Sequence, residues 1–137
     1  MEPKLMDSPL FNAPFCSIIS GPTSAGKTMW SLRFVEQAQT LIFPPPQEII
    51  WCYTEYQKGY QPLLENPNVR MVEGLPDINE LKKSADTPKL LVLDDMMLEA
   101  GHKGKGAQDI LTLFIRGSHH WGCSLVIFGT KCLLSWS

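Results

Sequence analysis

Short apolar runs alternate with longer segments in which apolar residues recur at helical spacing. The apolar runs predict strands at residues 15–20, 48–53, 69–72, 90–94 and 124–128. The helical spacing predicts helices over about 27–42, 78–85 and 107–118. Each strand is a continuous apolar run rather than an alternating one, which is typical of a parallel sheet buried on both faces. The pattern therefore predicts an α/β fold in which helices cover a parallel sheet.

Local signals indicate where these elements end. Three consecutive prolines, Pro44 to Pro46, end the first helix, and Asp77 with Glu80 three residues later predicts a capping box at the start of the second. Residues 54–67 are polar, and the pattern there predicts one helical turn around Leu63 and Leu64.

The chain is short enough for one domain. Residues 1–14 hold three prolines and little periodicity, so we expect an N-terminal arm there and a single domain over 15–137. With 44% apolar residues, that domain has enough material for a hydrophobic core.

A phosphate-binding loop lies between the first predicted strand and the first predicted helix. The motif G-x-x-x-x-G-K-[ST] is met by Gly21, Pro22, Thr23, Ser24, Ala25, Gly26, Lys27 and Thr28. Its backbone N–H groups and the following helix N-terminus would bind the phosphates of ATP. Lys27 would reach the β and γ phosphates, and the hydroxyl of Thr28 would bind Mg²⁺.

Two consecutive acids end the fourth apolar run. Asp94 would hold Mg²⁺ through water, and Asp95 is the candidate for polarising the water that attacks the γ-phosphate. Ligands of parallel sheets bind outside the carboxyl ends of the strands, where both Gly21 and Asp94 fall. Together with the phosphate-binding loop, the pair predicts the second half of an ATP·Mg²⁺ site.

Charge, cysteines and histidines limit the other function classes. The net charge is −2 and no basic run exceeds two residues, so composition alone gives no indication of nucleic-acid binding. No signal peptide and no membrane span is visible, which favours an intracellular protein.

The four cysteines form no C-x-x-C pair and are expected to be free, buried thiols. We expect His119 and His120 to make structural or subunit contacts rather than to bind zinc.

Three segments resemble a known family of motors. The runs Leu93-Asp94-Asp95-Met96-Met97, Phe114-Ile115-Arg116-Gly117-Ser118-His119-His120 and Ser124–Phe128 are similar to those of the viral genome-packaging ATPases of the FtsK–HerA superfamily. That group includes poxvirus-type enzymes and those of Maverick/Polinton transposons. The resemblance covers roughly residues 13–134.

This resemblance implies a fold, an activity and partners. The fold would be a P-loop NTPase three-layer α/β sandwich of the ASCE type, with a mainly parallel sheet that is incomplete at the C-terminus. In this class the strand at 124–128 inserts between the P-loop strand at 15–20 and the strand at 90–94. The activity would be Mg²⁺-dependent ATP hydrolysis that drives double-stranded DNA into a capsid, usually by a homo-oligomeric ring. Arg116 is a candidate finger for a neighbour's γ-phosphate.

The sequence departs from the family at two places. Lys131 stands where the family has a γ-phosphate-sensing Gln, and the chain ends soon afterwards. These departures leave nucleotide binding intact and leave hydrolysis open, so a nucleotide-binding pseudoenzyme is the alternative. A superfamily 3 helicase-like NTPase is the closest rival enzyme. A GTPase would need Asn-Lys-x-Asp on a late strand, and a small-molecule kinase would need an Arg-rich lid; neither is present.

Overall fold

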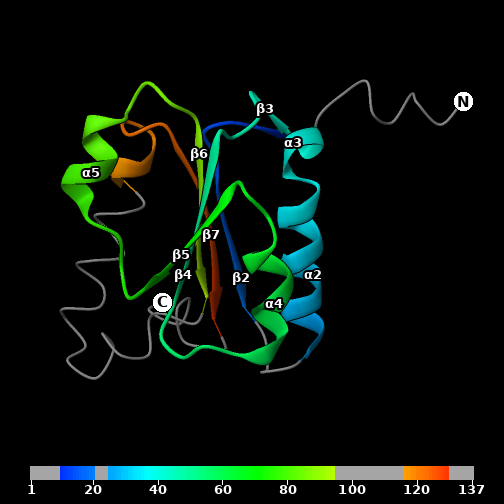
Figure 1. Ribbon diagram of the computed structural model, residues 1–137. Helices are drawn as coiled ribbons and strands as arrows, with labels where there is room; N and C mark the ends of the chain where they lie inside the picture. Colours follow the sequence, from blue (N-terminus) through cyan, green and yellow to red (C-terminus); the bar gives the residue numbers. More distant parts are fainter. Residues whose placement is uncertain (1–9, 21–24, 95–115, 130–137) are drawn as a thin grey trace, which may run out of the picture.

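A five-stranded parallel sheet forms the centre of the molecule (Figure 1). The computed structural model describes residues 10–20, 25–94 and 116–129. The strand order is β2–β7–β6–β4–β5, and the strands are β2 (Cys16–Ser20), β4 (Glu48–Tyr53), β5 (Val69–Glu73), β6 (Lys89–Asp94) and β7 (Cys123–Gly129). All five strands fall where the apolar runs predict them. β7 lies between β2 and β6, as the P-loop class requires, so the expected α/β fold and strand order are confirmed.

Helices cover the two faces of this sheet (Figure 1). One face carries α2 (Ala25–Glu36), the short helix η1 (Lys58–Tyr60) and α4 (Gln61–Leu64). The other face carries α5 (Ile78–Lys83) and Trp121. Since alternate strand residues point to opposite faces, β4 contributes Trp51 to one core cluster and Cys52 to the other. The layered arrangement is the one expected of the P-loop class.

The first helix is interrupted where the sequence predicts one helix over 27–42. α2 ends at Glu36, and a separate short helix α3 (Ala38–Leu41) follows. At Gln37, the backbone N–H donates to the carbonyls of both Arg33 and Phe34, a sharing that is common where helices tighten and end. None of the helices in the described ranges is long and apolar enough to cross a membrane.

The cap of α5 follows the sequence prediction in part. The Asp77 carboxylate accepts a hydrogen bond from the backbone N–H of Asn79 at 3.0 Å, as an N-cap residue does. The Glu80 carboxylate is instead 3.4 Å from the Nη2 atom of Arg70, whose Nε is 2.8 Å from Glu48. The hydrogen bond that Arg70 donates to Glu48 is the main cause that raises the pKa of Arg70. Glu80 therefore faces Arg70, and the expected capping box is formed only on the Asp77 side.

β2 is an edge strand within the described part of the chain, where β7 is its one neighbour. The N-terminal segment does not pair with it, because β1 (Phe11–Asn12) pairs with β3 (Ile42–Phe43) instead. The Leu125 N–H donates to the Phe15 carbonyl, so the backbone groups of Phe15 and alternate later residues point toward β7. The backbone groups of Cys16 therefore point to the open side of β2.

The three cysteines in the described ranges are free, but one of them is not buried. Cys52 and Cys123 lie in the core, and burial raises the pKa of Cys52 to about 12 and that of Cys123 to about 11. Cys16 is exposed, which corrects the expectation of a buried thiol. It stands beside Leu125 on the sheet face opposite α2, at the edge of the sheet, where neighbouring strands cover only one side.

A buried lysine fastens the start of β6. Lys89 is 2% exposed, and its ammonium group donates to three backbone carbonyls, those of Ser84 at 2.5 Å, Thr87 at 2.9 Å and Trp121 at 2.9 Å. These three hydrogen bonds offset the free-energy cost of burying the charged ammonium group. Lys89 thereby ties the segment after α5 to the segment before β7.

Candidate nucleotide-binding site

The carboxyl ends of β2 and β6 lie at the same edge of the sheet. Asp94, the last residue of β6, is level with Phe128 of β7, and Phe128 is level with Ile19 of β2. Two strand spacings separate Asp94 from Ile19, which corresponds to about 10 Å between Cα atoms. The phosphate-binding sequence begins two residues after Ile19. The fold therefore brings the two predicted halves of the site to one sheet edge.

The phosphate-binding loop is described only at its helical end. The backbone of residues 25–28 forms the first turn of α2, so α2 starts within the motif as the sequence predicts. Gly21, Pro22, Thr23 and Ser24 lie outside the described residues, as do the side chains of Lys27 and Thr28. Asp95 and Lys131 also lie outside them. The phosphate-binding and water-polarising roles of these residues remain predictions.

Asp94 has a partner that the sequence did not indicate. The hydroxyl of Tyr60 donates a hydrogen bond to Oδ2 of Asp94 at 2.5 Å. Tyr60 ends η1 and is 1% exposed, whereas Asp94 is partly exposed. The available signal was the spacing of the chain's three tyrosines by three and four residues, at Tyr53, Tyr56 and Tyr60. That spacing is easily missed, because the segment is otherwise polar.

Aromatic rings surround Tyr60. Ring centroids of Trp51, Tyr53 and Tyr56 lie 5.5, 5.6 and 5.5 Å from that of Tyr60, all with edge-on geometry. Each such pair stabilises a fold by about 0.5–1.5 kcal/mol, in addition to the stabilisation that comes from burying apolar area. The indole Nε1 of Trp51 is buried with no hydrogen-bond partner in the described part of the chain, so the packing of this ring is apolar.

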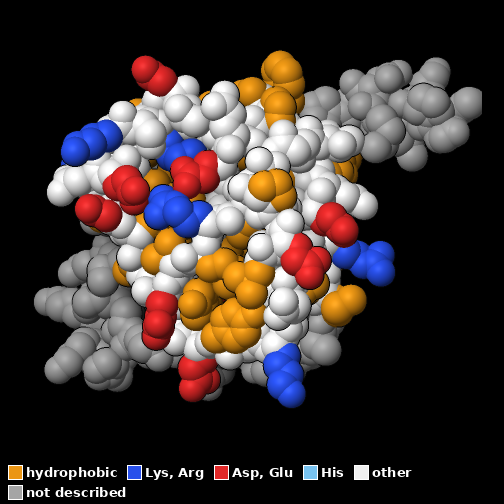
Figure 2. All heavy atoms as spheres, in the orientation of Figure 1, with side chains coloured by type: hydrophobic (Ala, Val, Ile, Leu, Met, Phe, Trp, Pro, Cys, Tyr) orange, Lys and Arg blue, Asp and Glu red, His pale blue; other side chains and the backbone are white. Residues whose placement is uncertain are grey.

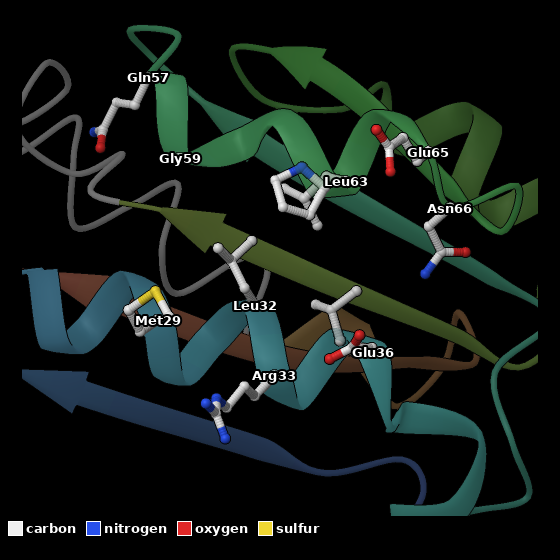
Figure 3. A pocket seen from close by; sticks show the side chains of 11 residues that line it. Met29, Leu32, Arg33, Glu36, Gln57, Gly59, Leu63, Glu65 and Asn66 are labelled. Carbon is white, nitrogen blue, oxygen red and sulfur yellow. The ribbon is translucent and has the colours of Figure 1, made fainter.

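A groove runs between α2 and the η1–α4 segment (Figure 3). Its volume is about 880 Å³. Met29, Leu32, Arg33 and Glu36 project from α2, facing Gln57, Gly59, Leu63, Glu65 and Asn66. On the outer face, Figure 2 shows hydrophobic side chains gathered beside α4, and Leu64 of α4 is 56% exposed. The groove adjoins α2 along its length and is distinct from the strand ends that carry Asp94.

The segment that resembles the packaging ATPases divides into buried and exposed residues. Arg116 is exposed in the helical turn at 116–118, which leaves it accessible to a neighbouring molecule. A Cβ on Gly117 would overlap the indole ring of Trp121, and Ser118 is 1% exposed. His119 and His120 are exposed and belong to no cluster of three or more metal-ligating side chains within the described ranges. Packing thus accounts for Gly117 directly.

Comparisons with known proteins reveal the fold. No family model matches the sequence, and no curated protein matches it. One similar solved structure is Thermomonospora curvata EccC (ATPases 2 and 3) in complex with a signal sequence peptide, with 17% sequence identity and a TM-score of 0.55. Another is EssC (ATPases 2 and 3) from Geobacillus thermodenitrificans, with 13% sequence identity and a TM-score of 0.51. Both matches cover 85% of this chain, which spans 27% and 25% of those chains. The chain therefore has the fold of a P-loop ATPase domain such as these.

Proposed function

We propose that this chain is an ATP-binding P-loop domain of the FtsK–HerA type, from an ATPase resembling the motors that translocate double-stranded DNA into viral capsids. The observation that supports this most is the strand order. It sets Asp94 at the sheet edge where β2 leads into the phosphate-binding sequence, with β7 between the two strands. A chance match to the loop motif would not require a carboxylate at that position.

The residues fit ATP and Mg²⁺ by their chemistry. Mg²⁺ prefers oxygen ligands and keeps several waters, which suits the Asp94 carboxylate and the Thr28 hydroxyl. Gly21 to Thr28 would hold the phosphates, with Lys27 on the β and γ oxygens. The bound metal would neutralise charge that develops on the transferred phosphoryl group. Asp95 would polarise the attacking water.

Further features of a motor follow by resemblance. A homo-oligomeric ring inside a cell would complete the site by bringing Arg116 of one subunit to the γ-phosphate of the next. The exposure of Arg116 supports such a contact. Lys131 in place of the sensor Gln supports the alternative, a pseudoenzyme that binds ATP without turnover.

Calorimetric titration with ATP tests the proposal. We expect saturable binding of one ATP per chain that is tighter with Mg²⁺ than with EDTA. Lys27→Ala should weaken binding under both conditions, because Lys27 contacts phosphate, whereas Asp94→Asn should weaken it only with Mg²⁺. Binding that persists unchanged in Lys27→Ala would overturn the assignment of the site.

A further inference from the structure

We infer that Tyr60 is a positioning residue, whose hydroxyl orients the Asp94 carboxylate toward the Mg²⁺ of the ATP complex. The inference rests on the proposed function, since it assigns Asp94 to the metal. It adds a residue from a segment that the phosphate-binding loop and the Asp94-Asp95 pair do not include.

The first step is that the hydroxyl of Tyr60 has a fixed position. The ring is 1% exposed and makes edge-on contacts with Trp51, Tyr53 and Tyr56 at centroid distances of 5.5, 5.6 and 5.5 Å. Trp51 itself is fully buried in the middle of β4. Rings packed in this way are confined to one rotamer, so the hydroxyl is held relative to the sheet.

The second step is that a fixed donor selects one orientation of the carboxylate. The χ2 angle of an aspartate has a broad distribution, so the two carboxylate oxygens can point in a range of directions unless a donor fixes them. The 2.5 Å hydrogen bond from Tyr60 engages Oδ2 and restricts that torsion. It has the length of a charge-assisted O–H···O⁻ bond, the stronger class of hydrogen bond.

The third step is that Mg²⁺ is sensitive to this orientation. Mg²⁺ demands nearly octahedral geometry, so a carboxylate that holds it directly or through water must present its oxygen in one direction. Removing a group that orients a metal ligand typically weakens metal binding by about 10–100-fold. Tyr60 should therefore affect the Mg²⁺-dependent part of ATP affinity and leave the Mg²⁺-independent part unchanged.

The test compares Tyr60→Phe with Tyr56→Phe. Both substitutions remove one hydroxyl oxygen and keep the ring, but Tyr60→Phe removes the hydroxyl that donates to Asp94. ATP dissociation constants are measured by calorimetry with Mg²⁺ and with EDTA, after circular dichroism and melting have verified that each variant is folded. Tyr60→Phe should raise the constant about 10-fold or more with Mg²⁺ and by less than about twofold with EDTA. Tyr56→Phe should change neither constant.

Three other outcomes would overturn the inference. A Tyr60→Phe variant that loses affinity equally with Mg²⁺ and EDTA would make Tyr60 a purely structural residue. So would an additive loss in Asp94→Ala/Tyr60→Phe, because a residue that acts through Asp94 has no effect once Asp94 is gone. If the wild-type chain binds ATP no more tightly than Lys27→Ala does, the proposed function is overturned as well.

Discussion

The hydroxyl of Tyr60 and the Asp94 carboxylate, 34 residues apart in the sequence, are joined by a 2.5 Å hydrogen bond. This contact connects η1, which lies beside the groove against α2, to the carboxyl end of β6. One face of the sheet therefore carries both the helix that starts in the phosphate-binding sequence and the ring that contacts Asp94. The site is a product of the tertiary fold as much as of its two motifs.

Lys89 should be a major contributor to stability. In Lys89→Met, three backbone carbonyls lose their shared donor, and the loss is most costly at Trp121, whose bond to Lys89 is buried. We expect the free energy of unfolding to fall by about 2–4 kcal/mol in urea denaturation. The exposed Lys83→Met makes the same chemical change as a control and should alter stability by less than about 0.5 kcal/mol. Equal stabilities of the two variants would contradict this role of Lys89.

Gly117 should be required by the indole ring of Trp121. A methyl group at position 117 would overlap that ring, so Gly117→Ala should destabilise the fold by about 1–3 kcal/mol. Trp121→Leu leaves space for the methyl group, and the double variant should therefore be more stable than the sum of the two single effects predicts. Denaturation of all four proteins measures this coupling. Strict additivity would show that Trp121 does not explain the glycine.

The open edge of β2 should promote self-association. Its outward N–H and C=O groups have no strand partner within the described ranges, and such an edge is a template for pairing. We expect concentration-dependent association in sedimentation velocity under reducing conditions. Cys16→Pro should reduce it, because Cys16 is the first residue of β2 and its N–H points to the open side. Cys16→Ser is the matched control and should associate like wild type. A monomer at every concentration would refute the prediction.

Hydrolysis by the isolated chain should be slow. If the proposed resemblance to packaging ATPases holds, Lys131 stands where they have a sensor Gln, and a missing arginine finger alone costs about 10³–10⁵ in rate. We expect turnover below about 1 s⁻¹ in a phosphate-release assay, and Lys131→Gln should raise it. Fast turnover by the monomer that Asp95→Asn abolishes would contradict this prediction.

The sheet was predictable from the sequence because its strands are continuous apolar runs. β4 has the predicted bounds 48–53, and β6 adds only Lys89 to the predicted 90–94. Burial of Lys89 was not predictable, since its three acceptors come from segments that only the fold brings together. The same holds for the exposure of Cys16, which depends on strand order.

The candidate site was predictable as two motifs but not as a set of contacts. Asp94 was identified from its position after an apolar run, and its place at the sheet edge is confirmed. Tyr60 was missed because the segment around it is mostly polar, and the position of its hydroxyl depends on packing against Trp51 of another element. The break at Gln37 was missed for a similar reason, since the apolar spacing continues across it.

The most direct test of the central claim is the melting temperature with and without ATP·Mg²⁺. At an ATP concentration one hundred times its dissociation constant, binding should stabilise the fold by about 2.7 kcal/mol. Lys27→Ala should lose most of that shift, whereas Lys83→Ala, the same substitution at an exposed position of α5, should keep it. An equal shift in wild type and Lys27→Ala would mean that the sequence from Gly21 to Thr28 is not where this protein binds nucleotide.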